Sequence, residues 1–283
     1  IDLADIELSD AIRLCDEGLL EPIDPAILPP APDGTPATED FVPGAIQDCA
    51  VASIVWGTVV AYDKTKFPGN EPSMLADFFD TTKYPGKRGL LKTAKRTMEM
   101  ALVADGVAPD KVYEVLGTDE GVARAFKKLD TIKKDIVWWE AGAQPPQLLA
   151  DGEVVMTTGY NGRFFAAEVG EGKPFGTIWD GEYMDYDLWA IPKGAPHLED
   201  AKKFLAFSTD TQRLADQAKY IAYGPARKSS NALIGMYKDG KTEMAPYMPT
   251  NPENMKNPIW TDPTFWADHD AELAEKFNAW LAS

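Results

Sequence analysis

Strand-like and helix-like segments alternate through the middle of this chain, and this alternation limits the possible folds more than any other feature of the sequence. Short segments with the length and residue types of strands occur at 88–91, 136–139, 153–158 and 185–191. Between and around them, helical spacing of apolar residues predicts helices at 95–104, 108–116, 121–132 and 145–150. Strands that alternate with helices in this way predict an α/β protein with a mostly parallel sheet. The last third is predicted to be mainly helical, with a final amphipathic helix at 269–281.

One long uncharged stretch, from Cys49 to Tyr62, predicts a chain crossing through the core. It is rich in Val and Ile, and it reads either as one buried strand or as two short strands broken at Trp56-Gly57. Its 14 residues are too few to span a bilayer, which takes about 20. The seven prolines between Glu21 and Pro43 predict an irregular surface loop before it.

Composition excludes several classes of function. The 283 residues suffice for one large domain or two lobes, and 45% of them are hydrophobic, which is ordinary for a globular protein. The net charge of −17 argues against nucleic acid and anionic membranes as partners, because few cations are present to neutralise phosphates. Only two histidines and two cysteines are present, which disfavours zinc sites and histidine-dependent catalysis. No nucleotide, hydrolase or metalloprotease motif occurs, so we expect no catalytic residues, no metal and no cofactor.

The two cysteines, Cys15 and Cys49, admit two interpretations. They are 34 positions apart, and they are either two reduced, buried residues or a disulfide, which an exported chain with an even cysteine count favours. The first residues, Ile1 to Asp5, have neither the basic nor the apolar region of a signal peptide, so we expect any export signal to lie upstream.

Aromatic residues and carboxylates are concentrated in three places. These are Trp138-Trp139-Glu140, Tyr160-Asn161-Gly162-Arg163, and the run from Trp179 to Trp189. Aromatic faces combined with carboxylates suit an organic cation. On a strand, Asp185, Asp187 and Trp189 point to one face, so this carboxylate pair could line a cleft. The alternatives are an acidic turn leading into a buried strand, or the acid and base of a glycosidase.

An ordered set of motifs resembles the solute-binding proteins of bacterial ABC importers, specifically the spermidine/putrescine type. The segments that carry the resemblance are Glu17-Gly18-Leu19-Leu20-Glu21-Pro22-Ile23-Asp24, Ile54-Val55-Trp56-Gly57-Thr58, Leu149-Ala150-Asp151-Gly152-Glu153-Val154, Tyr160-Asn161-Gly162, and Asp187-Leu188-Trp189-Ala190-Ile191-Pro192-Lys193-Gly194-Ala195. The resemblance runs from about Leu14 to Ser230 and is specific as an ordered set.

The resemblance implies a two-lobe type II periplasmic binding protein with a ligand cleft between its lobes. With crossovers near Ala61-Tyr62 and Ala190-Ile191, lobe one is expected to comprise 1–62 and 190–283, and lobe two 63–189. It further implies a periplasmic, monomeric protein with a membrane permease as partner, and it favours a Cys15–Cys49 disulfide. A strand–helix–strand segment that opens the family's first lobe is expected to be missing before Ile1.

The resemblance also assigns binding roles. Asp187 matches the carboxylate that receives the ligand amine, Tyr160 stands where the family has a Trp, and Trp56 belongs to the strand that enters the cleft. Asp185, Trp139, Glu140 and Asn161 complete the predicted ligand set. Two features depart from the polyamine binders, namely the basic run from Lys92 to Arg96 and the presence of Arg163 after Asn-Gly.

The predicted function is therefore a non-enzymatic binding protein for a small amine, such as a polyamine, a betaine or an amino-acid derivative. Arg163 is expected to repel the second ammonium of a diamine and to accept a carboxylate. The sequence leaves two alternatives open, namely the same fold with a sugar or an organic anion as ligand, and a carboxylate-dependent glycoside hydrolase.

Overall fold

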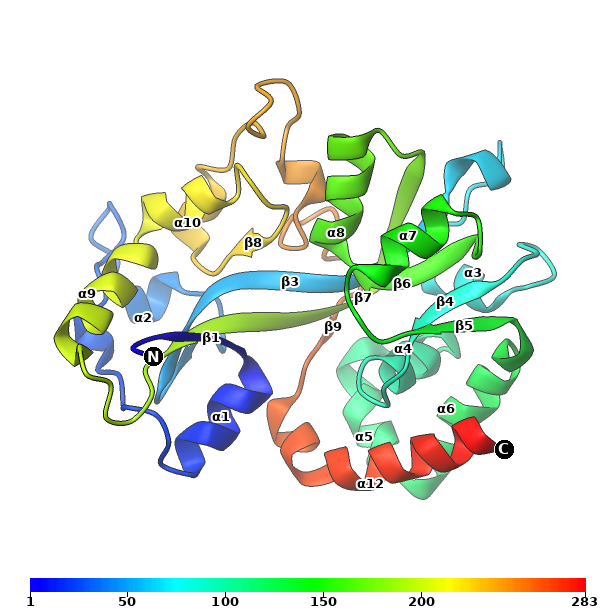
Figure 1. Ribbon diagram of the computed structural model, residues 1–283, viewed down its shortest axis with the longest axis horizontal. Helices are drawn as coiled ribbons and strands as arrows, with labels where there is room; N and C mark the ends of the chain where they lie inside the picture. Colours follow the sequence, from blue (N-terminus) through cyan, green and yellow to red (C-terminus); the bar gives the residue numbers. More distant parts are fainter. The chain divides into compact units, whose positions relative to one another are not determined.

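A computed structural model describes residues 1–283 and shows an α/β protein with two compact units, as Figure 1 illustrates. Unit 1 comprises Ile1–Trp56 and Asp185–Asn251, and unit 2 comprises Gly57–Met184 and Pro252–Ser283. Two long strands, β3 (Ala50–Asp63) and β7 (Phe175–Ala190), each continue from one unit into the other. None of the helices has the length and apolar character that a membrane-spanning segment requires.

The strand β3 is continuous, so the alternative of two strands broken at Trp56-Gly57 is wrong. On one side of that dipeptide, Ile54 and Val55 pair with β8 (Gly224–Pro225). On the other side, the residues from Thr58 to Tyr62 pair antiparallel with β6 (Met156–Tyr160). Strand pairing close to both sides of the glycine holds the backbone extended and outweighs glycine's weak strand propensity.

Unit 2 contains a mixed sheet rather than the mostly parallel one predicted. Its central strand β4 (Arg88–Leu91) runs parallel to both β6 and β5 (Ile136–Trp139). The pairing of β3 with β6 is antiparallel, and β9 (Ile259–Trp260) runs parallel to β7. The prediction of a mostly parallel sheet holds only for β4, β5 and β6, which alternate with helices along the chain. The strands β3 and β7 pair with segments that are distant in sequence, and the alternation does not predict the direction of those pairings.

Helices cover both faces of the unit 2 sheet (Figure 1). One face packs against α3 (Leu75–Phe79), α4 (Thr97–Ala104), α5 (Val112–Leu116), α6 (Asp119–Asp130) and α12 (Pro263–Ala282). The other face packs against α7 (Gln144–Ala150) and α8 (Asn161–Phe165), which continues as a π-helical turn at Ala166–Gly170. Almost every residue of α4 is buried, so this helix lies at the centre of the unit.

The C-terminal helix belongs to unit 2, which corrects the predicted assignment of residues 252–283 to lobe one. Its buried residues Trp266, Leu273, Phe277 and Trp280 recur at helical spacing and form one apolar face. That face packs into the same core as α4 and α6. Burying each such side chain stabilises the fold by about 1.5 to 3 kcal/mol, which holds the helix on this unit.

Unit 1 is built around the other halves of the two long strands. The strand β1 (Ala4–Glu7) pairs antiparallel with the end of β7, and β2 (Ile46–Gln47) and β8 pair with β3. The helices of unit 1 are α1 (Leu8–Asp16), α2 (Ala37–Asp40), α9 (Leu198–Ser208), α10 (Thr211–Gln217) and α11 (Lys228–Asn231).

Two long-range links order the first fifty residues of unit 1. The predicted Cys15–Cys49 disulfide is confirmed, and it joins the end of α1 to the residue before β3. In the proline-rich segment, Asp40 accepts a hydrogen bond from Arg227 at 3.1 Å, and both side chains are buried. Arg227 also donates to the Pro29 carbonyl at 2.7 Å, so this loop is attached to the residues that follow β8.

Candidate functional site

Asp187 lies near the end of β7 in unit 1, where several polar groups surround it. The antiparallel pairing with β1 places Glu7 directly opposite Asp187, and Asp5 opposite Trp189. The Trp56 indole N–H donates a hydrogen bond of 2.9 Å to Asp187 Oδ1. The Ser53 hydroxyl donates to the Asp187 main-chain carbonyl at 3.1 Å and lies 3.5 Å from an oxygen of Asp5. Asp187 and Trp56, two of the predicted binding residues, are thus in direct contact.

The environment of Asp187 disfavours its negative charge. Burial raises the pKa of this carboxyl to about 7, and the charges of Asp5, Glu7 and Asp185 act in the same direction, while the hydrogen bond from Trp56 opposes them. The Asp187 carboxylate forms no ion pair. A half-buried carboxylate next to other acidic groups and without a counter-ion is well suited to bind a cation.

Asp185 and Asp187 have different surroundings, although strand geometry directs them to the same face. Asp185 is fully buried, and its Oδ1 accepts a hydrogen bond of 2.8 Å from the Tyr186 backbone N–H. Its charge contributes to the raised pKa of Asp187. Asp185 therefore acts electrostatically on the half-buried Asp187 carboxylate from within the core.

In unit 2, the carboxyl ends of β4, β5 and β6 lie at one edge of the sheet, because these strands are parallel. The residues at these ends are Leu91, Trp139 and Tyr160. Ligands of α/β proteins bind outside this edge of a parallel sheet, at the point where the order of the strands reverses. Here β4 lies between β6 and β5, with connecting helices on opposite faces. The residues that follow the three strand ends are therefore candidates for ligand contact.

Arg96, which follows β4, is the most unusual residue of this edge. It is the N-cap of α4 with a φ of 75°, and it is the only non-glycine residue of the chain with positive φ. Its side chain is only 7% exposed, and Nη1 donates a hydrogen bond of 3.0 Å to the Tyr160 hydroxyl. Left-handed backbone at a non-glycine residue costs about 1 to 3 kcal/mol and often occurs at ligand sites. A buried guanidinium at the N-terminus of a helix provides a site for an anion such as a carboxylate.

The ring of Tyr160 is held tightly by its neighbours. It contacts Trp139 edge to face at 6.1 Å between ring centroids, and the guanidinium of Arg96 lies 5.7 Å from its centroid. A Cβ atom at Gly142 would lie 2.7 Å from this ring, so only glycine fits there. Trp139 is 1% exposed, and its indole N–H has no hydrogen-bond partner. These contacts fix the tyrosine hydroxyl where it orients Arg96.

Three other predicted residues have less specialised surroundings. Arg163 is exposed on α8. Glu140 is exposed and forms a surface ion pair with Lys92 at 3.1 Å. Asn161 is buried, and its Oδ1 accepts a hydrogen bond of 3.1 Å from the Gly57 backbone N–H. Their roles in binding stay predictions.

Sequence reasoning did not select Arg96 as a binding residue. The run from Lys92 to Arg96 was noted only as a departure from the polyamine binders. The available signal was the position of this run, which begins directly after the strand β4 and ends directly before the helix α4. Which of its basic side chains turns inward depends on the backbone at Arg96, and the sequence pattern does not show this.

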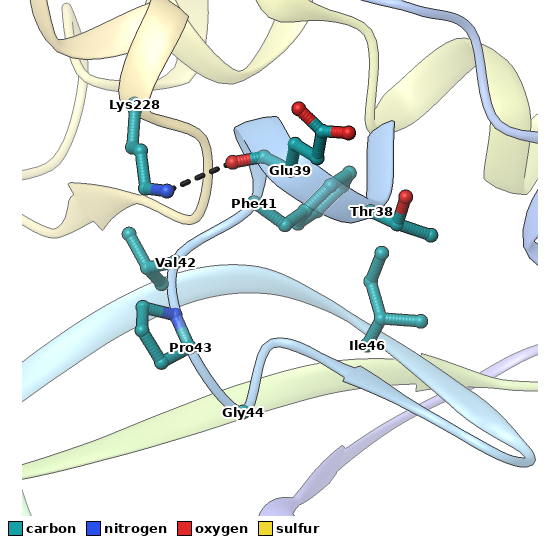
Figure 2. A pocket seen from close by; sticks show the side chains of 8 residues that line it. All are labelled: Thr38, Glu39, Phe41, Val42, Pro43, Gly44, Ile46 and Lys228. Carbon is teal, nitrogen blue, oxygen red and sulfur yellow. Dashed lines mark hydrogen bonds between the residues drawn. The ribbon is translucent and has the colours of Figure 1, made fainter. Parts of the chain in front are cut away.

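Unit 1 also contains a pocket of about 670 Å³ that none of the predicted residues lines (Figure 2). On one side of it the Lys228 ammonium donates a hydrogen bond of 2.8 Å to the Glu39 carbonyl. Its lining consists of Thr38, Glu39, Phe41, Val42, Pro43, Gly44, Ile46 and Lys228. A second pocket of about 640 Å³ lies beside the disulfide. Neither pocket includes Asp187 or Arg96.

Comparison with solved structures confirms the two-lobe periplasmic binding protein fold. The chain superimposes on the periplasmic binding protein MotA from A. tumefaciens B6 in complex with glucopine with a TM-score of 0.84 and 33% identity, covering 99% of this chain and 83% of that one. It superimposes on the Atu4243-GABA receptor with a TM-score of 0.82 and 33% identity, covering 99% and 81%. A spermidine/putrescine-binding protein of Streptococcus pneumoniae aligns at 16% identity and a TM-score of 0.74, covering 99% and 84%, which shows the fold alone.

Sequence comparison places the chain in a family. It is 46% identical over 281 residues to the gamma-aminobutyric acid-binding protein of Pseudomonas aeruginosa, covering 99% of this chain and 76% of that protein. Residues 1–250 match the family model of bacterial extracellular solute-binding proteins. The chain belongs to the bacterial extracellular solute-binding protein family.

Proposed function

We propose that this protein binds a small zwitterionic amino acid of the γ-aminobutyrate type and delivers it to an ABC importer, without catalysing a reaction. Two charged groups carry the proposal, one within each unit. Asp187 is a half-buried carboxylate with no ion pair, and Arg96 is a buried guanidinium held by Tyr160. The ammonium of the ligand would bind Asp187, and its carboxylate would bind Arg96.

The same pair of groups argues against the spermidine/putrescine type of ligand that the sequence motifs suggested. A diamine carries a second ammonium, which a guanidinium repels because arginine does not lose its proton. The relatives support this choice, since two of them are named for binding γ-aminobutyrate. The spermidine/putrescine-binding structure shares only 16% identity.

Arg163 was predicted to receive the anionic end of the ligand, and we propose Arg96 in its place. Arg163 is exposed on α8, so water screens its charge, whereas burial strengthens the attraction between Arg96 and a carboxylate. Arg96 is also preorganised by its hydrogen bond to Tyr160, which lowers the entropic cost of binding.

The family match supports the rest of the proposal. We propose a periplasmic location, a membrane permease as partner, and two lobes that correspond to unit 1 and unit 2. The glycosidase alternative has no support from the three relatives cited above, whose names describe binding proteins or a receptor. A chromogenic glycoside should therefore show no turnover with this protein.

Isothermal titration calorimetry with four ligands tests the proposal. We expect γ-aminobutyrate to bind more tightly than butyrate, n-butylamine or putrescine, because only γ-aminobutyrate satisfies both charged groups. A thermal-shift measurement provides a second readout, since ligand at about 100 times its Kd stabilises the folded state by about 2.7 kcal/mol. Putrescine binding more tightly than γ-aminobutyrate would contradict the proposal and restore the polyamine interpretation.

A pair of arginine variants tests the binding role of Arg96. Arg96→Met should weaken γ-aminobutyrate binding by roughly 10- to 100-fold, the size of a lost hydrogen bond to a charged group. Arg163→Ala is the matched control, and it should change the affinity by less than about twofold. The reverse result would assign the anionic end of the ligand to Arg163, as the sequence predicted.

A further inference from the structure

The Cys15–Cys49 disulfide joins the two segments of unit 1 that flank the strand carrying Asp187. In the order of the sheet, β7 lies between β1 and β3. Cys15 belongs to α1, which begins at Leu8, directly after the last residue of β1. Cys49 directly precedes β3. The disulfide therefore connects the two neighbours of β7 to each other, with α1 as the link on one side.

Both flanking strands place polar groups at Asp187. On β1, Glu7 is directly opposite Asp187, and the Cβ atoms of such a pair lie about 4.5 to 5.5 Å apart. On β3, the Trp56 indole N–H donates a hydrogen bond of 2.9 Å to the Asp187 carboxylate. The Ser53 hydroxyl donates to the Asp187 main-chain carbonyl at 3.1 Å and lies 3.5 Å from Oδ1 of Asp5. The carboxylates of β1 are therefore part of the surroundings of Asp187.

The helix α1 has few attachments besides the disulfide. Of its residues, only Leu8 and Ala11 are buried. Its ion pairs join Arg13 to Asp10 and Glu17, and exposed pairs of this kind stabilise a fold very little. The strand before α1 has four residues and lies at the end of the strand order, so it pairs on one side only. Elements with few buried contacts open locally at low cost, so we expect opening of the disulfide to loosen β1 and α1.

The disulfide can be reached by a small reductant. Both cysteines line the pocket of about 640 Å³ in unit 1. A thiolate of a dithiol attacks one cysteine sulfur, the S–S bond breaks, and a mixed disulfide forms. The second thiol of the reductant then displaces the other cysteine-bound sulfur. Both cysteines are left as thiols with two electrons and two protons gained, and the dithiol is oxidised to a disulfide.

We propose that the Cys15–Cys49 disulfide is a redox-sensitive clamp on β1 that sets how strongly the Asp187 site attracts the ammonium of the ligand. The carboxylates of Asp5 and Glu7 attract an ammonium placed at Asp187, and they also repel the negative charge of Asp187 itself. Loosening β1 moves both carboxylates away. The reduced protein then attracts the ammonium less but ionises Asp187 more easily. The proposal rests on the proposed function, which assigns the ammonium to Asp187.

The two effects of loosening β1 depend differently on pH. Burial raises the pKa of Asp187 to about 7, and the hydrogen bond from Trp56 opposes this rise. The acidic groups that add to the rise are Asp5, Glu7 and Asp185. At about pH 8 Asp187 is almost fully ionised with or without β1, so only the lost attraction counts. At about pH 6 the easier ionisation of Asp187 offsets the lost attraction.

Calorimetry with oxidised wild type and the double variant Cys15→Ser/Cys49→Ser tests the proposal. At about pH 8 the variant should bind γ-aminobutyrate roughly 3- to 10-fold more weakly, and at about pH 6 the two Kd values should agree within about twofold. n-Butylamine, which carries only the ammonium, should give the same pattern. Wild type reduced with dithiothreitol should behave as the variant. A general loss of structure would weaken binding equally at both pH values, so a ratio of Kd values that does not change with pH would overturn the proposal.

Removing the charges of β1 directly shows whether the disulfide acts through them. In oxidised protein, Asp5→Asn/Glu7→Gln should weaken γ-aminobutyrate binding roughly 3- to 10-fold at about pH 8. In the double cysteine variant the same substitutions should change the Kd by less than about twofold, because β1 has already moved. Asp10→Asn, on the exposed side of α1, is the matched control and should leave the Kd unchanged in both backgrounds. An equal effect of Asp5→Asn/Glu7→Gln in both backgrounds would overturn the proposal.

A measurement on wild type alone keeps the proposal testable if the double cysteine variant fails to fold. Carbon-detected NMR can follow the titration of the Asp187 carboxyl in unliganded protein before and after reduction. Reduction should lower the titration midpoint by roughly 0.5 to 1 pH unit, and an unchanged midpoint would overturn the proposal. If wild type binds no γ-aminobutyrate at all, the proposed function fails. If wild type binds it and reduction leaves the pH dependence of the Kd unchanged, only the clamp fails.

Discussion

Replacing Asp187 by Asn should abolish most amine binding and, with it, one component of the pH dependence. The substitution keeps the shape of the side chain and removes the charge that an ammonium requires. A hydrogen bond to a charged group contributes roughly 1.5 to 3 kcal/mol, so the Kd should rise about 10- to 150-fold at pH 8. Asn can still accept the 2.9 Å hydrogen bond from Trp56, which limits structural disturbance.

The size of the pH effect follows from the titration of Asp187. With a pKa of about 7, about one tenth of the molecules carry the carboxylate at pH 6 and about nine tenths at pH 8. The ammonium of γ-aminobutyrate stays charged over this range. Because only the ionised fraction binds, the ratio of the variant's Kd to that of wild type should increase about tenfold from pH 6 to pH 8.

The stability of the unliganded protein should change in the opposite direction. The folded-state pKa of Asp187 lies above the ordinary value of 3.8, so the folded state binds more protons than the unfolded state between about pH 4 and pH 7. The contribution of Asp187 to the free energy of unfolding therefore decreases as the pH rises from about 4 to about 7. Asp187→Asn should be roughly 1 to 3 kcal/mol more stable than wild type at pH 8, and equally stable near pH 4.

Calorimetry at about pH 6 and pH 8, and chemical denaturation at about pH 4 and pH 8, would test this reasoning. An affinity ratio that stays constant between pH 6 and pH 8 would refute the assignment of the ammonium to Asp187. A variant that is less stable than wild type at pH 8 would show that the charge of Asp187 is stabilised in the folded state despite its burial and its acidic neighbours.

Three further predictions concern the framework of the two units. Cys15→Ser should lower the free energy of unfolding by about 4 kcal/mol, because it opens a loop of 34 residues; reduced wild type should match it in denaturant titrations. Arg88→Met should lower the free energy of unfolding by roughly 3 to 5 kcal/mol in the same titrations, because this buried guanidinium donates hydrogen bonds to four main-chain carbonyls. A decrease of less than about 1 kcal/mol would contradict that role. Gly142→Ala should displace the Tyr160 ring and weaken γ-aminobutyrate binding roughly 3- to 30-fold by calorimetry, whereas unchanged affinity would show that the ring position is unimportant.

Local patterns in the sequence were sufficient for several features of this protein. The spacing of apolar residues predicted the strands β4, β5 and β6 and the helices near them, because helices and strands each repeat apolar positions with a characteristic period. The Cys15–Cys49 disulfide was favoured by the cysteine count and by the family resemblance. The ordered motifs between Leu14 and Ser230 led to the family of solute-binding proteins, which the family model confirms.

Other features depended on contacts between residues that are far apart in the chain. The helix α12 was recognised as amphipathic, but its apolar face could be matched to the core of unit 2 only in the folded molecule. The direction of strand pairing around β3 was likewise missed, because a pattern of apolar residues does not identify the partner of a strand.

The candidate site shows the same division between sequence and structure. Asp187 and Tyr160 were selected from motifs, and their residue types alone suggest amine binding and aromatic contact. Tertiary structure decided that Arg96, rather than Lys92 or Lys95, turns inward to Tyr160. The backbone conformation at Arg96, which residue type does not encode, brings this about. It also decided that Asp187 lies among other acidic groups without a counter-ion. Sequence determines which charges are available, whereas burial and long-range pairing determine which of them a ligand would meet.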